Sequence, residues 1–425
     1  MEEVVDARRE HDPDGGAPGR ADALEQLAVP ARVRAAGRRA EGQANEDRPC
    51  RHHRHPRDVE PADEHGQRSP HPRSVRRARS SFRRPEATVH RPWPRFRRNP
   101  RREATRSAES AHEERTMALP LLRLGAERTR QLGDLIAISH RSHMELNTVL
   151  EWSRGVDRSL PPKRADHSAI HGTPYWDALT ECQRLEVLWQ AVAQAASQFV
   201  WLEEALSPLF IRLLHKNQGR IPEPIREYMM IFCKEEIVHT QMFRRYLKLA
   251  GLPLYGGVQI QSLIEELADM HPIAGVLCVY LGEAVAEEAV IRQSGPGIDP
   301  LTKQLFWEHH KEEARHLAFG RWICEGFFER SSAETRRKVS FLVRSFMSSL
   351  VPEFTYSAEV SQHLAFDIGI DPKDADEIRR VRLLPHNQRL AHERWGGLLA
   401  WIKRLGLVSA DYDWYDPVPP MSAQI

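Results

Sequence analysis

The chain has 425 residues and a net charge of +2, so its overall charge gives no indication of nucleic-acid binding. No apolar run reaches the roughly 18 residues that a membrane-spanning helix requires, so the sequence predicts no membrane partner. The five cysteines are widely spread without a CxxC pair, and no signal peptide is recognisable. This pattern predicts a reduced, cytoplasmic protein without a zinc ribbon or a disulfide framework.

The first 116 residues differ from the rest of the chain. They contain 26 arginines and 20 acidic residues, a net charge of +6, but no Lys, Ile or Tyr. A segment so poor in large apolar residues cannot bury a core, so we predict that 1–116 is disordered. Its interspersed acidic residues argue against a basic arm that binds nucleic acid. The same composition is typical of GC-rich DNA translated upstream of a true start, here Met117, and both interpretations stay open.

Residues 117–425 form the second predicted unit, with a net charge of −4. Apolar residues at spacings of three and four predict helices over 176–216, 223–250, 259–293, 299–328, 333–364 and 373–405. Two Asp-Pro pairs, Asp299-Pro300 and Asp371-Pro372, are typical of helix starts. Pro208 lies inside the first long helix and predicts a kink there. Without a convincing alternating stretch, we expect an all-α helical bundle with extra helices beyond a core of four.

Acidic residues interrupt the apolar faces of the first two long helices. Over 176–216 the apolar stripe includes Glu203, whereas Glu204 lies on the opposite face. The helix over 223–250 carries Glu236 and His239 at ExxH spacing, which places both on one face. Each of these helices therefore directs ionisable groups toward the predicted interior.

The next two helices repeat this feature. In 259–293, Glu283 and Glu287 share a face and periodicity does not choose between them, while Glu288 lies off that face. In WEHHKEEARHLAFG, residues i, i+4 and i+7 lie on one face. The residues at these positions are His309, Glu313 and His316. The same spacing predicts that Glu308 and Glu312 face solvent.

Charged side chains inside a bundle need a compensating partner. The order along four successive helices is Glu, ExxH, Glu and HxxxExxH, which matches the carboxylate and histidine pattern of two-metal helical bundles. Carboxylate oxygens with imidazole nitrogens suit iron or manganese, and the scarcity of thiolates argues against zinc or iron–sulfur clusters. The sequence therefore predicts a site for two metal ions.

The body of the chain resembles the p-aminobenzoate N-oxygenase (AurF-type) di-iron oxygenases. The resemblance covers most of 176–320, and its most specific element is His309, one turn before the second ExxH. It implies a ferritin-like fold and favours Glu283 over Glu287 by its spacing to His309. The seven metal ligands that it implies are Glu203, Glu236, His239, Glu283, His309, Glu313 and His316.

The resemblance also implies a function. Two iron ions, Fe²⁺ and Fe³⁺ in turn, would activate O₂ to oxidise a small aromatic amine to its hydroxylamine or nitro product, with Mn as an alternative metal. No catalytic residues are expected beyond the metal ligands. No Gly-rich dinucleotide motif occurs, so we expect an external electron donor, and a homodimer is a further expectation.

Other functions fit the same ligand pattern. The alternatives are a di-iron C-hydroxylase or desaturase, a ferritin-like iron-binding or storage protein, and a helical scaffold that the metal only stabilises. Near the predicted site, Tyr280, Arg315 and Cys233 are candidates to support the ligands, and Trp201 and Trp307 are candidates to line a substrate cavity.

Overall fold

The computed structural model describes residues 121–256, 267 and 270–414 of the chain. The predicted disordered segment 1–116 and most of 257–269 lie outside these residues. Regular structure in the described part is helical throughout, without a strand, so the all-α prediction is confirmed. None of the described helices has both the length and the apolar character to cross a membrane.

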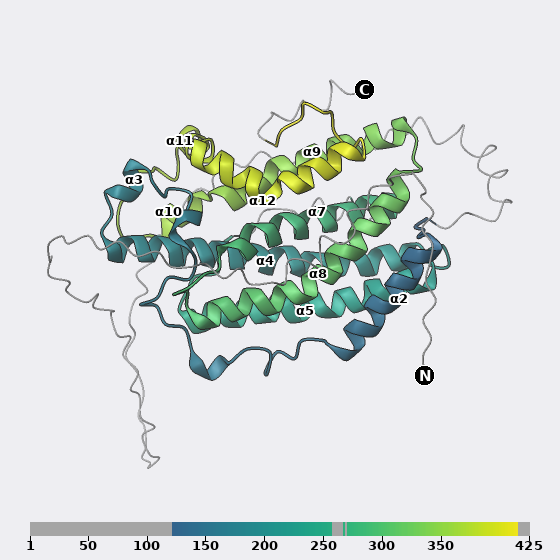
Figure 1. Ribbon diagram of the computed structural model, residues 1–425, viewed down its shortest axis with the longest axis horizontal. Coiled ribbons are helices and arrows are strands. Elements are labelled where there is room, and N and C mark those ends of the chain that lie inside the picture. The colour runs from purple at the N-terminus through teal and green to yellow at the C-terminus, as the bar shows by residue number, and fades with distance from the viewer. Residues whose placement is uncertain (1–120, 257–266, 268–269, 415–425) are drawn as a thin grey trace, which may run out of the picture. The chain divides into compact units, whose positions relative to one another are not determined.

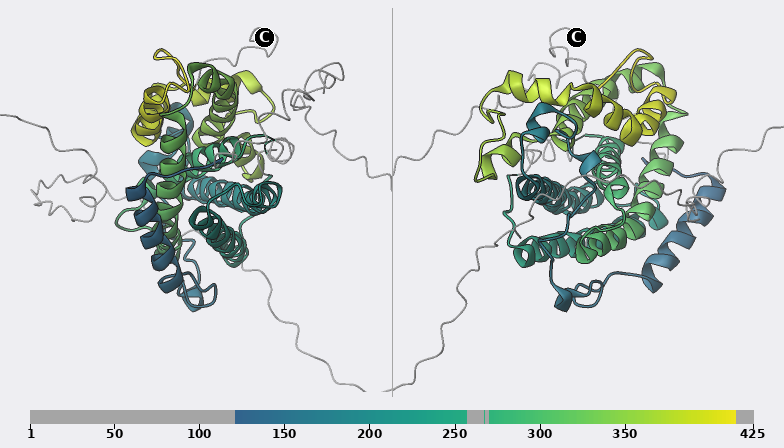
Figure 2. Two further views of the ribbon diagram at one scale, coloured as in Figure 1. Left: turned by 90° about the vertical axis from the view of Figure 1, so that its right-hand side faces the viewer. Right: turned by 60° about the vertical axis from the view of Figure 1, so that its left-hand side comes forward.

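Four long helices form the centre of the fold: α4 (Glu181–Lys216), α5 (Glu223–Ala250), α7 (Pro272–Val290) and α8 (Pro300–Phe328). Helix α4 packs on α5 and α7, and α8 packs on the same two helices, so the four close into a ring. Figure 1 shows them side by side, and Figure 2 shows the same grouping from two further directions. This four-helix core is the ferritin-like arrangement that the sequence predicts.

The starts of these helices follow local sequence signals. Thr180 and Gln183 form a capping box at the start of α4, which satisfies backbone N–H groups that have no partner within the helix. Asp299 accepts a hydrogen bond of 2.8 Å from the backbone N–H of Thr302, and Pro300 is the first residue of α8. The predicted helix start at Asp299-Pro300 is therefore confirmed.

The second predicted Asp-Pro start is wrong. Helix α11 (Ala375–Arg382) begins after Asp374, whose carboxylate accepts from the backbone N–H groups of Asp376 and Glu377. Asp371 instead accepts from the backbone N–H of Lys373 within a turn. Asp374, three residues later, is the capping residue because its carboxylate reaches the first free N–H groups of α11.

Three of the long predicted helices are divided, and a fourth ends earlier than predicted. The first becomes α3 (Pro174–Asp177) and α4, the fifth becomes α9 (Ala333–Thr355) and α10 (Ala358–His363), and the sixth becomes α11 and α12 (Pro385–Arg404). Pro385 begins a new helix because proline lacks the N–H that would continue the previous one. Within the predicted helix 259–293, α7 covers Pro272–Val290 and a short 3₁₀ turn follows it, whereas most of 257–269 lies outside the described residues. Helix α4 runs through Pro208 without ending, and the kink there stays a prediction.

The remaining helices cover the four-helix core. Helices α9 and α12 pack on α7, as Figure 1 shows, and α10 packs on α4. Helix α2 (Ala126–Arg141), which the sequence analysis did not predict, packs on α5 and α8. Helix α2 therefore covers a face of the core that a four-helix bundle alone would leave open to solvent.

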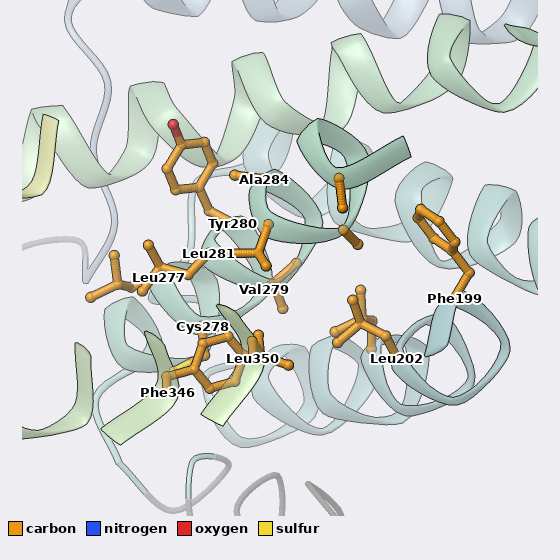
Figure 3. Close-up of a cluster of buried hydrophobic side chains, with 14 of the residues drawn as sticks. Phe199, Leu202, Leu277, Cys278, Val279, Tyr280, Leu281, Ala284, Phe346 and Leu350 are labelled. Atoms are coloured by element: carbon orange, nitrogen blue, oxygen red, sulfur yellow. The ribbon is translucent and has the colours of Figure 1, made fainter. Parts of the chain in front are cut away.

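The apolar core between α4, α7 and α9 lies beside the charged residues. Figure 3 shows Phe199 and Leu202 of α4 in one cluster with side chains of α7 and with Phe346 of α9. Helices α7 and α8 approach closely at Gly320, where an added Cβ would lie 2.9 Å from the Cβ of Tyr280. Only glycine fits this contact, which holds the two helices at a fixed short separation.

Candidate metal centre

The seven residues predicted as metal ligands, hereafter the candidate ligands, meet inside the four-helix core. Each has an exposed fraction of 0% or 1%. They come from α4, α5, α7 and α8, and they are Glu203, Glu236, His239, Glu283, His309, Glu313 and His316. Because ionisable groups are not buried without compensation, their common burial indicates a bound partner or a strong mutual interaction.

Glu313 lies at the middle of this cluster. Its Oε1 atom lies 3.1 Å from Nδ1 of His239, 3.4 Å from Nε2 of His309 and 3.2 Å from Nδ1 of His316. Three imidazoles from two helices thus converge on one carboxylate. The remaining carboxylates surround this point, and Glu203 Oε1 lies 2.9 Å from His309 Nε2.

The cluster contains two overlapping groups of donor atoms. Each group has four side chains whose ligand atoms all lie within 4.8 Å of one another. The two groups share His239 and Glu313, so they define two adjacent positions for cations. The first group adds Glu203 and His309, and the second adds Glu236 and His316.

Several oxygens of the cluster lack hydrogen-bond donors among the described residues. Both carboxylate oxygens of Glu236 and both of Glu283 are buried without a hydrogen-bond donor, and so is Oε2 of Glu203. One oxygen of Glu236 lies 2.8 Å from His316 Nδ1 without hydrogen-bond alignment. An unsatisfied buried polar group costs about 1–3 kcal/mol, and more if it is charged. Cations at the two positions would remove this cost, so the residues present fit a pair of metal ions.

The electrostatics of the cluster also favour added positive charge. Burial, together with the neighbouring carboxylates Glu313, Glu236 and Glu203, raises the pKa of Glu283 well above its usual value. Burial alone would lower the pKa of His239, yet the carboxylates around it raise this pKa well above the usual range. Protons are therefore held tightly in the absence of other cations, and metal ions can replace them.

The structure separates Glu283 from Glu287, which the helical period did not. Glu283 faces the other candidate ligands with both oxygens free of hydrogen bonds. Glu287 lies 2.5 Å from Nδ1 of His310 and 3.4 Å from Nδ1 of His309. Although burial acts to raise the pKa of Glu287, these two imidazoles lower it below the usual value. Glu287 therefore holds the outer side of His309. Glu283 is buried near Glu313, Glu236 and Glu203 but belongs to neither four-residue donor group, so its role as a ligand stays a prediction.

Each histidine among the candidate ligands contacts a second carboxylate through its other ring nitrogen. Glu312 Oε2 lies 3.0 Å from His239 Nε2, Glu235 Oε2 lies 2.8 Å from His316 Nε2, and Glu287 is the partner of His309. We call Glu235, Glu287 and Glu312 the outer carboxylates. Such contacts fix the tautomer and the orientation of a metal-binding imidazole. In each case they leave the opposite nitrogen directed at the two cation positions.

The predicted exposure of Glu312 is wrong. Its exposed fraction is 3%, and Oε1 accepts a hydrogen bond of 3.0 Å from the backbone N–H of Met144. The segment that follows α2 covers this side of α8, and the sequence analysis did not predict α2. Glu204, in contrast, is exposed as predicted and pairs with Arg244.

Arg315 joins two of the outer carboxylates. Its Nη2 atom lies 2.8 Å from Glu235 Oε1 and 3.2 Å from Glu312 Oε1. Its Nε–H donates to the hydroxyl of Ser139 in α2, at 2.9 Å. Arg315 therefore supports the site as expected, although it pairs with the outer carboxylates and not with a candidate ligand. Glu235 was not predicted from the sequence, where its position directly before Glu236 is the only signal.

The other predicted supporting residues have different surroundings. Cys233 donates from its thiol to the backbone oxygen of Ser207, and burial raises the pKa of this thiol to about 12, so it stays protonated. The Tyr280 ring packs 4.7 Å from the ring of Trp401. Trp201, a candidate to line a substrate cavity, donates from its indole N–H to the backbone oxygen of Tyr255. These contacts support the packing of the helices around the site.

Paired carboxylate and imidazole donors inside a four-helix core define a ferritin-like helical protein with a candidate two-metal site. Residues 125–406 match the family model described as P-aminobenzoate N-oxygenase AurF, and the chain belongs to this family. The match covers well over half of the chain and includes all seven candidate ligands. The match confirms the resemblance to this family that the sequence predicted. The family is one of oxygenases, so the chain is assigned to this class of enzyme.

Proposed function

We propose that the chain is a non-haem di-iron oxygenase that uses O₂ to oxidise an arylamine at nitrogen, to the hydroxylamine or nitro product. The observation that carries this proposal is the convergence of three imidazoles on Glu313, among carboxylates with unpartnered oxygens. The family match supports N-oxygenation over other oxidations.

In this proposal the metal ligands are the seven candidate ligands. Glu313 and His239 belong to both donor groups. Glu313 has two carboxylate oxygens and would be able to hold both ions, whereas His239, whose Nε2 contacts Glu312, would hold one ion through Nδ1. Because the donors are oxygens and neutral imidazoles, iron is favoured and manganese is the alternative. His309 adds a third nitrogen to the set, next to Glu203.

The iron pair, when bound, supplies the electrons that reduce O₂. The residues of the chain hold and shield that pair. The outer carboxylates orient the three imidazoles, and Arg315 keeps two of these carboxylates in place. The rings of Phe199 and Phe243 lie 4.8 and 4.9 Å from His309, and Phe232 lies 3.9 Å from His316. These rings exclude water from the ligand side that they cover.

Oxygenation with O₂ would require a supply of electrons. The sequence carries no Gly-rich dinucleotide motif, so the proposal includes a separate electron donor. A homodimer and a cytoplasmic location stay predictions from the sequence.

Anaerobic loading with Fe(II), followed by O₂ with and without 4-aminobenzoate, tests the proposal. Measured O₂ uptake together with 4-hydroxylaminobenzoate or 4-nitrobenzoate in the product mixture is the expected result. Glu313→Ala should abolish both signals, whereas Glu204→Gln, which changes an exposed neighbour of a candidate ligand, should keep them. Ring-hydroxylated products would instead indicate a C-hydroxylase, and uptake of many irons per chain without product would indicate storage.

A further inference from the structure

Trp307 is an exposed aromatic side chain on α8, the helix that carries three of the candidate ligands. Its exposed fraction is 56%, and it lies at the edge of a cavity of about 270 Å³, as the sequence analysis expected of a cavity-lining residue. Single exposed apolar side chains are common on protein surfaces and need no functional reason. The contacts of Trp307 therefore decide whether it has a role.

A continuous series of contacts joins Trp307 to a candidate ligand. The Trp307 ring lies 6.0 Å from the ring of His310. Nδ1 of His310 lies 2.5 Å from Oε1 of Glu287, and Oε2 of Glu287 lies 3.4 Å from Nδ1 of His309. Nε2 of His309, on the other side of the ring, lies 2.9 Å from Oε1 of Glu203, within the first donor group. The series therefore connects the surface with one of the two cation positions.

Among the outer carboxylates, Glu287 alone contacts a partly exposed side chain in the described part of the chain. That side chain is His310, which is 34% exposed. Glu235 and Glu312 both pair with Arg315, whose side chain is only 10% exposed. Their contacts end at a buried cation, whereas the contacts of Glu287 lead to the surface.

This difference matters because the candidate ligands are inaccessible to a large partner. Their exposed fractions are 0% or 1%, so a protein that donates electrons cannot touch them. Electron transfer through a protein becomes steeply slower as the gap between donor and acceptor widens. Aromatic rings and short polar contacts placed in series divide one wide gap into several narrow ones. The contacts from Trp307 to His309 have this arrangement.

The surface around Trp307 carries a net positive charge. Lys303 and Lys311 lie one turn before and one turn after it on α8, and both are exposed. The ion pairs near Trp307 and His310 are neutral overall, and they are Lys311–Glu308 and Arg292–Glu288. Lys303 has no carboxylate partner in the described part of the chain, so its charge remains. An exposed aromatic side chain beside a basic one suits a small, transient interface with an acidic partner.

We propose that an acidic one-electron carrier protein docks at Trp307 and that its electrons reach the metal centre through His310 and Glu287. The electron route is the series Trp307, His310, Glu287 and His309. In each transfer the carrier loses one electron and one ferric ion becomes ferrous, and no bond forms or breaks. This inference deepens the proposed function by naming the class of its electron donor, and it rests on that function for the iron pair.

Anaerobic stopped-flow mixing of the iron-loaded, air-oxidised chain with a reduced plant-type 2Fe–2S ferredoxin tests the electron route. This ferredoxin is an acidic one-electron carrier, and its own absorbance follows its oxidation. Isothermal titration calorimetry with the oxidised ferredoxin measures docking separately from electron transfer. We expect Trp307→Leu to bind ferredoxin about tenfold more weakly and to be reduced more slowly at every ferredoxin concentration. Trp322→Leu, the same substitution on the same helix beside Arg128, should behave like the wild type in both measurements.

Two further variants separate the electron route from docking. His310→Gln keeps an N–H donor for Glu287 but removes the ring, so reduction at saturating ferredoxin should slow severalfold while the affinity is unchanged. Lys303→Glu should have the reverse effect, a severalfold lower affinity at low ionic strength with an unchanged rate at saturation. Lys338→Glu, at an exposed lysine paired with Glu334, should change neither quantity.

Iron assays and melting temperatures check that each variant is folded and retains its iron. If His310→Gln loses iron, Trp307→Leu decides alone, because its side chain is exposed. A wild-type chain that ferredoxin neither binds nor reduces would overturn the proposal. So would a Trp307→Leu variant that matches the wild type, or an equal loss in Trp322→Leu.

These measurements contain neither an amine nor O₂, so they are independent of the proposed reaction. Electron transfer that depends on Trp307 and His310, without any arylamine oxidation, would refute only the proposed function. Arylamine oxidation, with reduction rates that are indifferent to both residues, would refute only the electron route.

Discussion

The His316 ring lies between two successive glutamates of α5. Its Nε2 atom is 2.8 Å from Oε2 of Glu235, and its Nδ1 atom is 2.8 Å from Oε1 of Glu236. One glutamate therefore holds the outer edge of the imidazole, while the next faces the cation positions with it. Adjacent residues on a helix point about 100° apart, which allows the pair to reach both edges of one ring.

The contact between Glu235 and Nε2 of His316 predicts an effect of Glu235 on metal binding. Glu235→Gln removes the negative charge that orients His316 and keeps its Nδ1 free to bind a metal ion. We expect an affinity for Fe(II) that is about 10–100-fold lower for one of the two ions. Anaerobic competition with a chromophoric chelator measures this change.

Glu204→Gln provides the matched control for that experiment. It is the same substitution next to a candidate ligand, but Glu204 is exposed and pairs with Arg244. Its affinity should equal that of the wild type. An unchanged affinity in Glu235→Gln, or an equal loss in both variants, would contradict the role of the outer carboxylate.

Glu283 and Glu287 should differ in the number of ions that the variants retain. Glu283→Ala removes a carboxylate that faces the cluster with two unpartnered oxygens, so we expect fewer than two irons per chain at saturating Fe(II). Glu287→Ala removes a contact to His309 and His310 and should retain both ions with weaker binding. Iron and protein assays after gel filtration give the ratios. The reverse order of losses would show that Glu287 is the ligand.

The sequence predicted the inner part of the site because its residues follow helical periods. Glu203 was predicted from an apolar stripe, and Glu236 and Glu313 from ExxH spacing that places each beside a histidine on one helix face. Glu235 and Glu312 lie beside those stripes, and their burial depends on Arg315 and on the segment around α2. Such tertiary contacts are not encoded in the period of one helix. The same limit applies to Glu283 and Glu287, which share a helix face and differ only in their partners.

Helix boundaries show a similar division. The limits of α5 and α8 were predicted because Pro, Gly and a capping Asp mark their ends. The sequence did not predict the break between α9 and α10 or the break between α11 and α12, because apolar spacing continues across both. At the first break Tyr356 adopts an extended backbone and Ser357 caps the next helix.

The close approach of α7 and α8 predicts a stability effect. Gly320→Ala places a methyl group 2.9 Å from the Cβ of Tyr280, which cannot move without shifting α7. We expect the free energy of unfolding to fall by about 1–3 kcal/mol. Gly133→Ala, on α2 with no atom within 4 Å of the added Cβ, should raise it by about 0.5–1 kcal/mol. Urea titration of the metal-loaded proteins compares the two, and similar changes in both would contradict the close contact.

Lys163 predicts a pH-dependent stability. Its pKa is about 7 in the folded chain against an ordinary value of 10.5, so between these values the unfolded chain holds a proton that the folded chain lacks. Stability then rises with pH across this range, and below it the buried ammonium costs up to roughly 5 kcal/mol, at about 1.4 kcal/mol per pKa unit. Lys163→Met should raise the melting temperature most below pH 7 and progressively less toward pH 10.

Differential scanning fluorimetry in anion-poor buffer measures that trend against Lys338→Met. Lys338 is exposed, so its variant should differ from the wild type by a small amount that does not depend on pH in this range. A melting-temperature gain of Lys163→Met that is the same at pH 6 and pH 10 would contradict a buried, unpaired ammonium group.

The central claim is that the candidate ligands hold two cations side by side. Anomalous X-ray diffraction at the iron edge, from crystals of the Fe(II)-loaded chain, tests it most directly. We expect two peaks roughly 3.5–4 Å apart, both within bonding distance of Glu313. A single peak, or peaks away from Glu313 and the three histidines, would contradict it.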